Sequence, residues 1–212
     1  MGHLYTPQKN SLASVFAEVH HECVRTFLAI FPPKRFAQEI SERLFCDEYA
    51  QLRWMKTENL HITLCFLGKT EPRVITHMQN HLPGVFESFH SFSVQLGPIH
   101  NLGSKNQPHS LVLDVREGGE QLAALNSSIR NSLTPWMSLE DYPYCPHMTI
   151  GRWRRGKNRK ESGASTLLPD DKTANLGVFR VREVVLLESI LESSGARYRP
   201  LQSWPLKEFK DD

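Results

Sequence analysis

Two short segments of the chain repeat one chemical pattern: a histidine, an apolar residue, a threonine and a second apolar residue. They are His61-Ile62-Thr63-Leu64 and His147-Met148-Thr149-Ile150. Successive side chains of a β-strand point to opposite faces, so each histidine shares a face with the threonine two residues later. An imidazole beside a hydroxyl, supplied twice, suits an anionic substrate that needs one general acid and one general base. We therefore expect the chain to hold such a substrate between the two segments.

Chance does not account for the repeat. The chain has 10 histidines among 212 residues and is 40% apolar, and random placement then gives roughly 0.1 matches per chain. A single copy is typical of a structural histidine at the start of a strand. Two copies in matching contexts favour the functional interpretation.

The spacing of apolar residues predicts the elements that position the two segments. Strands are expected over 24–31, 61–67, 92–99, 111–115, from 147 onward, 179–191 and 198–204. Helices are expected over 36–48, 73–81 (ended by Pro83 and Gly84) and 122–133. Each segment thus closes a strand–helix–strand unit: Phe27 precedes His61 by 34 positions, and Leu111 precedes His147 by 36. This near-equal spacing predicts an internal duplication, with two similar lobes facing one another across a cleft.

A basic run follows the second segment, and it is either a solvated loop or a surface that contacts phosphates. It consists of Arg152, Arg154, Arg155, Lys157, Arg159 and Lys160. Arg152 lies five residues after His147, so an unbroken strand would turn its side chain away from the cleft. Glycine commonly marks a β-bulge, and Gly151 therefore predicts a bulge or a strand end that redirects Arg152.

Composition limits the remaining possibilities. The formal net charge is only +2, so any contact with nucleic acid must come from local patches. Four scattered cysteines without a C-x-x-C pair suit reduced thiols in a cytoplasm, and no apolar run is long enough to span a membrane. Residues 1–22 are polar and weakly patterned. We expect them to form an extension with some disorder, followed by a single bilobal domain over 23–212.

The sequence offers no convincing metal site. His77 and His81 lie four residues apart on an expected helix, a spacing that can hold zinc. The metalloprotease version of this motif needs glutamate where Met78 stands, and no third ligand is evident. We interpret the pair as part of a solvated helix face, and we expect neither a metal ion nor another cofactor.

With both segments placed, the chain resembles the two-histidine phosphoesterase superfamily, specifically the LigT-like RNA 2′,3′-cyclic phosphodiesterases. The resemblance covers about residues 24–206. It rests on the opening strand at 25–30, on 53–68 around the first segment, on 146–152 around the second, and on the C-terminal pattern within 187–206. It implies an α+β fold of two pseudo-symmetric lobes, each an antiparallel sheet with helices on the outside, around a central cleft.

The resemblance also implies a reaction and a role for each residue. The reaction opens a terminal 2′,3′-cyclic phosphate on RNA and leaves a 2′-phosphate, without a metal ion. His61 would be the proton donor to the departing 3′ oxygen, and His147 the proton acceptor that activates water. Thr63 and Thr149 would bind the non-bridging phosphate oxygens, and Arg152 would add positive charge where negative charge develops.

The residues leave three functions open. These are hydrolysis of the cyclic phosphate, 2′–5′ ligation of RNA halves at the same site, and binding of RNA ends without catalysis. Hydrolysis and ligation share the acid, the base and the phosphate contacts, whereas the intact histidines and threonines argue against mere binding. The expected partners are RNA, tRNA included, with a 2′,3′-cyclic phosphate end, or small cyclic nucleotides. We expect no membrane partner, and we expect a cytoplasmic monomer.

Overall fold

The computed structural model describes residues 22–46, 51–104, 107–154, 176–193 and 195–208. Its elements are β1 (Val24–Ile30), α1 (Lys34–Leu44), β2 (Leu52–Trp54), the 3-10 turn η2 (Thr57–Asn59), β3 (Ile62–Thr70), α2 (Pro72–Phe86), β4 (Phe92–Ser104), β5 (Gln107–Glu117), α3 (Gly119–Leu133), β6 (His147–Trp153), β7 (Val178–Val181), β8 (Glu183–Glu192) and β9 (Gly195–Pro205). Most of the expected N-terminal extension, residues 1–21, and the basic run beyond Arg154 lie outside the described residues.

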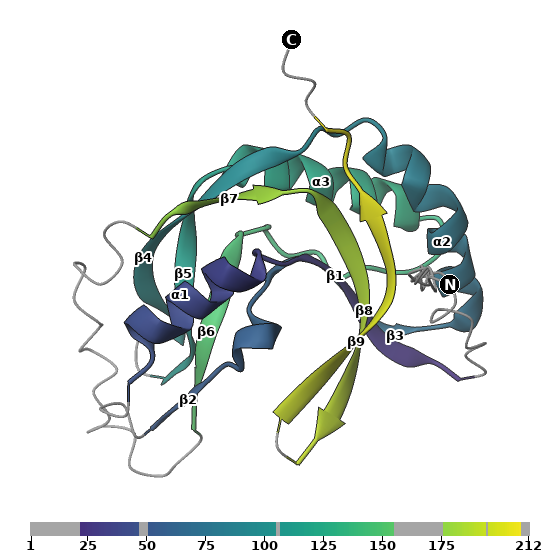
Figure 1. Cartoon of the computed structure of the whole chain (residues 1–212). Helices are drawn as coiled ribbons and strands as arrows, with labels where there is room; N and C mark the ends of the chain where they lie inside the picture. The colour runs from purple at the N-terminus through teal and green to yellow at the C-terminus, as the bar shows by residue number, and fades with distance from the viewer. Residues whose placement is uncertain (1–21, 47–50, 105–106, 155–175, 194, 209–212) are drawn as a thin grey trace, which may run out of the picture.

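The strands form one curled sheet in which neighbouring strands run antiparallel (Figure 1). The strand order is β7-β4-β5-β6-β3-β1-β8-β9, with β2 beside β6. The half that ends in β6 meets the half that begins at β3 through a single register pair, Ile62 opposite Met148. Each of the two repeated segments therefore lies on the strand at which its half joins the other. The predicted α+β architecture of two antiparallel lobes is confirmed.

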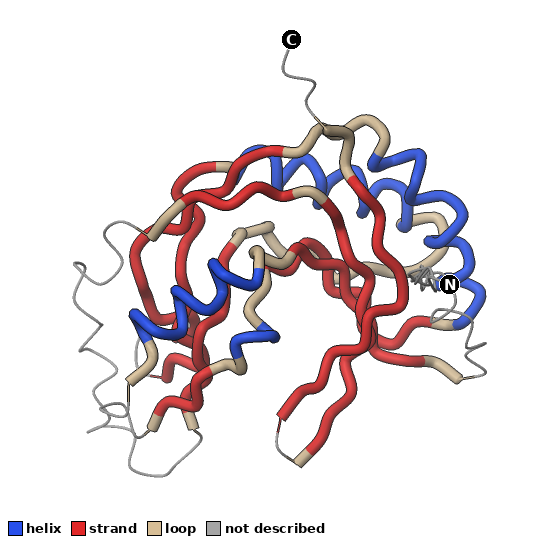
Figure 2. Tube along the Cα trace, viewed as in Figure 1, coloured by secondary structure: helices blue, strands red, loops and turns tan. Residues whose placement is uncertain are grey.

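The helices bury the apolar stripes that their sequences predict. Helix α1 buries Phe36, Ile40 and Leu44, and the Phe36 ring lies 5.1 Å from the ring of Phe179 on β7. Helices α2 and α3 lie side by side (Figure 2), and α3 packs against β3. Helix α3 thus supports the strand that carries the first repeated segment.

Helix α2 continues past Pro83 and Gly84, which were expected to end it. Leu82 and Phe86 are fully buried, and the Phe86 ring lies 5.5 Å from Trp204. Burial of these two large side chains stabilises another turn of helix. This gain outweighs the loss of the backbone hydrogen bond that proline cannot donate. The expected end of this helix is therefore wrong.

The strand expected over 179–191 is two strands. Strand β7 pairs with β4, whereas β8 pairs with β1 and β9 at the other end of the sheet. The chain passes between these partners at Arg182, whose carbonyl accepts a hydrogen bond of 2.7 Å from the Leu206 N–H. A continuous apolar run does not reveal a change of pairing partner, and the three-residue strand β2 is too short to show periodicity at all.

Candidate active site

The junction between β3 and β6 brings the two repeated segments together. Ile62 lies opposite Met148 in an antiparallel pair, and extending this register by one residue on each side places His61 opposite Thr149 and Thr63 opposite His147. Directly opposite residues share a face and have Cβ atoms roughly 4.5–5.5 Å apart. Each histidine therefore faces the threonine of the other lobe. We call this side of β3 and β6 the motif face.

Both histidine rings are fixed in the same way. The Nδ1 atom of His61 lies 2.7 Å from the carbonyl oxygen of Asn59, and Nδ1 of His147 lies 2.8 Å from that of Cys145. A carbonyl oxygen only accepts hydrogen bonds, so Nδ1 carries the proton in each ring and donates it. The remaining nitrogen, Nε2, is then the atom of each ring that can exchange a proton with a substrate.

The surroundings of His61 are aromatic. Its ring centroid lies 5.2 Å from Phe27, 5.6 Å from Phe31 and 5.3 Å from Tyr198, the last in an edge-on arrangement of 88°. Burial is the main cause that lowers the pKa of His61 to about 4; the nearby charges of Arg152 and His147 lower it further, and the hydrogen bond to Asn59 opposes them. These rings have no counterpart recorded around His147 within the described part of the chain.

The hairpin of β8 and β9 contacts the residues at the start of the first repeated segment. Asn59 donates a hydrogen bond of 3.2 Å from Nδ2 to the carbonyl of Ala196, and Tyr198 on the same strand covers His61. Burial raises the pKa of Tyr198, so its phenol stays protonated at neutral pH. The residue that fixes the His61 ring is thus itself held by the hairpin.

Strand β6 contains the bulge that the sequence predicts before Arg152. Thr149 pairs with Val112, and Gly151 pairs with the next residue along β5, Leu111. The extra residue reverses the alternation, so that Arg152 is exposed although both Gly151 and Trp153 are buried. A Cβ on Gly151 would lie 2.9 Å from the Leu52 side chain, which explains why glycine is required there.

Strand β3 contains a matching bulge. Thr63 pairs with Ala29, Cys65 with Leu28, and Phe66 with Phe27. Phe66 therefore returns to the motif face three residues after Thr63, as Arg152 does three residues after Thr149. The Phe66 side chain is 71% exposed. The two lobes thus place an aromatic ring and a guanidinium at equivalent positions.

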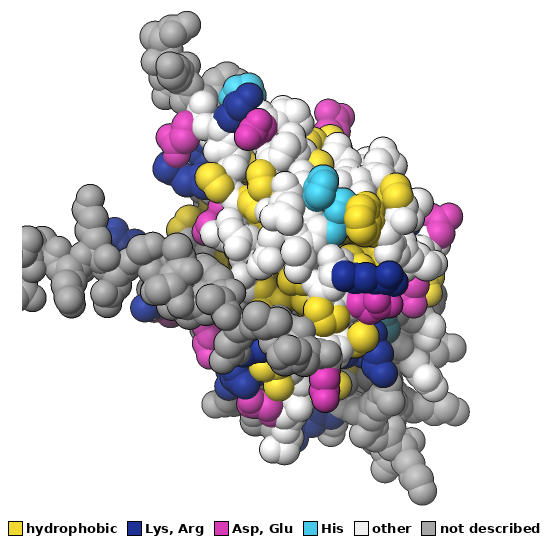
Figure 3. All heavy atoms as spheres, turned by 90° about the vertical axis from the view of Figure 1, so that its right-hand side faces the viewer, with side chains coloured by type: hydrophobic (Ala, Val, Ile, Leu, Met, Phe, Trp, Pro, Cys, Tyr) yellow, Lys and Arg dark blue, Asp and Glu magenta, His cyan; other side chains and the backbone are white. Residues whose placement is uncertain are grey.

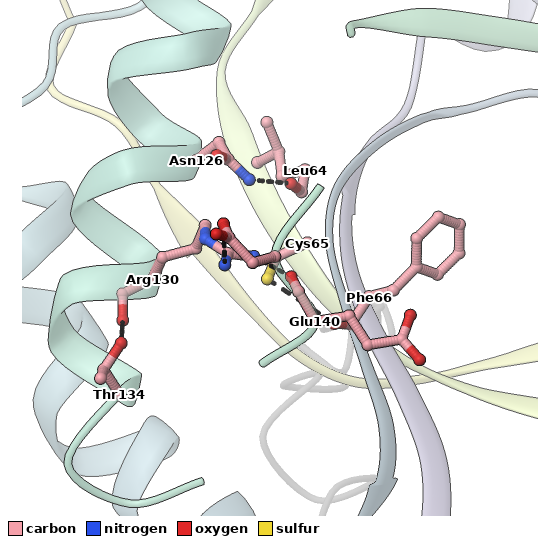
Figure 4. Close-up of polar contacts among 8 residues, drawn as sticks. Leu64, Cys65, Phe66, Asn126, Arg130, Thr134 and Glu140 are labelled. Carbon is pink, nitrogen blue, oxygen red and sulfur yellow. Dashed lines mark hydrogen bonds and ion pairs between the residues drawn. The ribbon is translucent and has the colours of Figure 1, made fainter. Parts of the chain in front are cut away.

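Two side chains from beyond the sheet secure the bulge in β3, and Figure 4 shows the contact of one of them, Asn126, with Leu64. Asn126 on α3 donates a hydrogen bond of 2.7 Å from Nδ2 to the carbonyl of Leu64, and Tyr144 donates one of 3.1 Å to the carbonyl of Thr63. Burial raises the pKa of the Cys65 thiol to about 11, against the opposing effect of Arg130. Cys65 is consequently a protonated packing residue and no nucleophile at neutral pH.

A second arginine accompanies Arg152. Arg53 lies opposite Arg152 across the β2–β6 pair, and its Nη1 atom lies 3.5 Å from the position that a Cβ on Gly195 would occupy. Elsewhere, Figure 3 shows side chains of both charges interspersed on the side of the molecule that it presents. Two adjacent guanidinium groups beside the motif face supply local positive charge that the nearly neutral chain lacks as a whole.

Comparison with known proteins places the chain in a family. A sequence model described as the 2'-5' RNA ligase superfamily matches residues 32–190. The chain belongs to this superfamily. An RNA 2',3'-cyclic phosphodiesterase of Thermotoga maritima is 33% identical to it over 132 residues, which cover 61% of this chain and 70% of the relative. The RNA 2',3'-cyclic phosphodiesterase of Methanocaldococcus jannaschii is 25% identical over 183 residues, which cover 85% of this chain and 100% of the relative.

Solved structures share the superfamily fold. The apo form of E. coli LigT superposes with a TM-score of 0.69 at 24% identity, over 88% of this chain and 99% of that one. A crystal structure described as a phosphoesterase superposes with a TM-score of 0.70 at 25% identity, over 87% and 99% of the two chains. The resemblance found in the sequence is confirmed.

Two residues beside the repeated segments, Phe66 on the motif face and Tyr198 on β9, were not among the candidates from sequence. Phe66 lies at an odd separation from His61, and only the same bulge argument that was applied to Arg152 could have found it. Tyr198 is far from both segments in the sequence and reaches His61 through the β8–β9 hairpin, which no local pattern predicts.

The histidine pair on α2 matches the expected solvated helix face only in part, because His81 is exposed but His77 is buried. His77 is only 8% exposed, and its ring stacks at 3.7 Å on Trp136 and at 4.0 Å on His81. His77 thus packs the segment that follows α3 onto α2. That interpretation of His77 is therefore wrong, because Trp136 lies in a segment beyond the helices whose position periodicity does not reveal.

Proposed function

We propose that this protein hydrolyses the 2′,3′-cyclic phosphodiester at an RNA end to a 2′-phosphomonoester. Relatives that carry the name RNA 2',3'-cyclic phosphodiesterase support the proposal over most of the chain. The observation that carries it is the register at Ile62 and Met148, because this register sets the histidine of each lobe beside the threonine of the other.

In the proposed reaction a water oxygen bonds to phosphorus while the bond from phosphorus to the 3′ oxygen breaks. His147 Nε2 takes a proton from the water, and His61 Nε2 gives a proton to the 3′ oxygen. The hydroxyls of Thr63 and Thr149 donate to the non-bridging oxygens, and Arg152 stabilises the charge that develops on them. An in-line displacement needs base and acid on opposite sides of phosphorus, and the neighbouring strands β3 and β6 each supply one histidine to the motif face.

The low pKa of His61 must be reconciled with its proposed role as proton donor. A pKa of about 4 keeps the imidazole neutral at neutral pH in the free protein, whereas a proton donor must be protonated. A bound phosphate places negative charge beside the ring, which favours the protonated form and raises the pKa. We therefore propose that His61 takes up its proton as the anionic substrate binds.

The finer parts of the proposal concern setting and assembly. His61, Thr63, His147, Thr149 and Arg152 all come from one chain, so a monomer suffices for the reaction. The cysteines at positions 23, 46, 65 and 145 are free, which suits a reducing cytoplasm. Within the described residues no helix is long and apolar enough to cross a membrane. We propose RNA ends, those of tRNA included, or small cyclic nucleotides as substrates.

The test is to incubate the protein with an RNA that ends in a 2′,3′-cyclic phosphate, with and without EDTA, and to identify the terminal phosphate. A 2′-phosphate formed equally in both samples supports the proposal. A 3′-phosphate, loss of turnover in EDTA, or turnover that survives in both His61→Asn and His147→Asn would contradict it.

The superfamily description favours a second candidate, 2′–5′ ligation. In ligation the 5′-hydroxyl of a second RNA would replace water, with His147 as its base and the same phosphate contacts. Supplying a 5′-hydroxyl RNA in the same assay separates the two functions, because ligation yields a longer RNA that lacks a terminal phosphate.

A further inference from the structure

A carboxylate lies beside the proposed base. In the antiparallel pair of β5 and β6, Asp114 is directly opposite His147. Directly opposite residues share a face, so the Asp114 side chain extends the motif face onto β5, with its Cβ atom roughly 4.5–5.5 Å from that of His147. Strand β5 borders β6 on the side away from β3. The carboxylate therefore flanks His147 on the side away from the first lobe.

A histidine on the next strand holds this carboxylate. His100 on β4 is directly opposite Val112, which precedes Asp114 by two residues and shares its face. The Nδ1 atom of His100 lies 3.1 Å from Oδ2 of Asp114, and it donates this hydrogen bond because a carboxylate only accepts. The two side chains are 38% and 36% exposed, and so exposed a pair adds little to stability. A carboxylate near a phosphate site also opposes substrate binding, so its position calls for a functional reason.

The equivalent position of the first lobe holds a phenylalanine. Strands β1 and β3 pair as far as Ile30, which is opposite Ile62. One further step of this register places Phe31 opposite His61. The two ring centroids lie 5.6 Å apart, so a side chain at this position reaches the histidine beside it. An apolar neighbour disfavours a positive charge on the proposed acid, whereas Asp114 favours a positive charge on the proposed base.

We propose that Asp114 is a positioning residue that stabilises the positive charge of His147 when His147 takes the proton from water. This inference rests on the proposed function. In that step an O–H bond of water breaks, the oxygen bonds to phosphorus, and the proton bonds to His147 Nε2, while Nδ1 keeps its own proton and its hydrogen bond to the Cys145 carbonyl. The imidazole gains one positive charge on the way to the transition state. The neighbouring carboxylate therefore stabilises the transition state more than the ground state, and His100 acts by holding that carboxylate in place.

The test is a pair of double-mutant cycles, read by single-turnover kinetics on an RNA that ends in a 2′,3′-cyclic phosphate. Asp114→Asn removes the charge and keeps the shape. We expect it to lower the rate at saturating protein by about 3- to 30-fold and to leave the half-saturating concentration unchanged or lower. In a His61→Asn background the same factor should be lost. In a His147→Asn background the loss should vanish, because no imidazolium forms.

Two further variants separate the charge from its position. Glu117→Gln removes an exposed carboxylate three residues, or about 10 Å, further along β5, and it should leave the rate unchanged. His100→Leu leaves the Asp114 carboxylate in place without its donor. We expect it to lower the rate by a smaller factor than Asp114→Asn does, and again only where His147 is present. Thermal unfolding of each variant identifies any general loss of structure.

Each failure has its own signature. If the wild type does not turn over the RNA, the proposed function fails and the inference fails with it. If the wild type is active, three results overturn the inference alone. They are an Asp114→Asn variant that keeps or exceeds the wild-type rate, one that changes only the half-saturating concentration, and one that loses the same factor in the His147→Asn background, as a merely structural residue would.

Discussion

The two lobes of the site share their backbone geometry and differ in what surrounds it. In each lobe a histidine donates from Nδ1 to the carbonyl two residues before it, a threonine follows on the same face, and a bulge brings a third side chain to that face. In the first lobe that side chain is Phe66, and aromatic rings surround His61. In the second lobe it is Arg152, and no aromatic ring of the described residues packs on His147 in the same way.

This difference shows how a duplicated scaffold can acquire unequal functions. The backbone fixes where the two imidazoles lie, whereas the neighbouring side chains give each ring its surroundings. Burial among aromatic rings, with a smaller effect from the charge of Arg152, lowers the pKa of His61 to about 4. The two histidines are therefore equivalent in position, while their surroundings differ.

The largest effect is expected from removing either imidazole. His61→Asn and His147→Asn should each lower kcat for an RNA 2′,3′-cyclic phosphate by about 10²–10⁴-fold, because each removes one proton transfer. The double variant should be little worse than either single one, because the two groups act on one transition state. Single-turnover rates measure this, and singles that multiply in the double variant would show that the histidines act independently.

The guanidinium of Arg152 should contribute more to turnover than either threonine hydroxyl. Arg152→Met should lower kcat by about 10²-fold, because the positive charge acts where negative charge develops. The hydroxyl variants Thr63→Val and Thr149→Val should cost less, about 10-fold each. Steady-state kinetics on adenosine 2′,3′-cyclic phosphate measure both. An Arg152→Met variant that changes only KM would mean that Arg152 binds the ground state and does not stabilise the transition state.

Part of this site could be predicted from the sequence, and part of it could not. His61, Thr63, His147 and Thr149 could be placed from sequence, because a strand dictates that residues two apart share a face. The bulge before Arg152 could be predicted because glycine marks it. The matching bulge in β3 has Cys65 at that position and a support from Asn126, 62 positions away in the chain. Such long-range support leaves no local signal, so Phe66 was missed.

The aromatic surroundings of His61 should control the pH dependence. In the free protein the pKa of the His61 imidazole should lie near 4 in the wild type, as followed by NMR titration of the ring. Tyr198→Ala exposes His61 to water and should move this pKa upward toward the ordinary value of 6.5. Tyr198→Phe keeps the ring and should not move it, and an unchanged His61 pKa in Tyr198→Ala would exclude burial by Tyr198 as a cause.

The smallest effect concerns stability. The unfolded chain protonates His61 near pH 6.5 and the folded chain near pH 4, so the free energy of unfolding should fall as the pH drops through this window. The contribution of His61 is at most about 3 kcal/mol. His61→Phe, which fits among aromatic rings, should unfold in urea with a shallower pH dependence between pH 7 and 4. Parallel curves for the two proteins would contradict the burial of a neutral imidazole.

The most direct test of unequal roles in equal lobes uses an RNA end whose cyclic phosphate carries sulfur in place of the 3′ bridging oxygen. A thiolate leaves without a proton, so the general acid becomes dispensable while the base does not. We predict that His61→Asn recovers most of the wild-type rate on this substrate and that His147→Asn does not. Recovery in His147→Asn alone would reverse the roles, and recovery in neither variant would contradict acid–base catalysis by this pair.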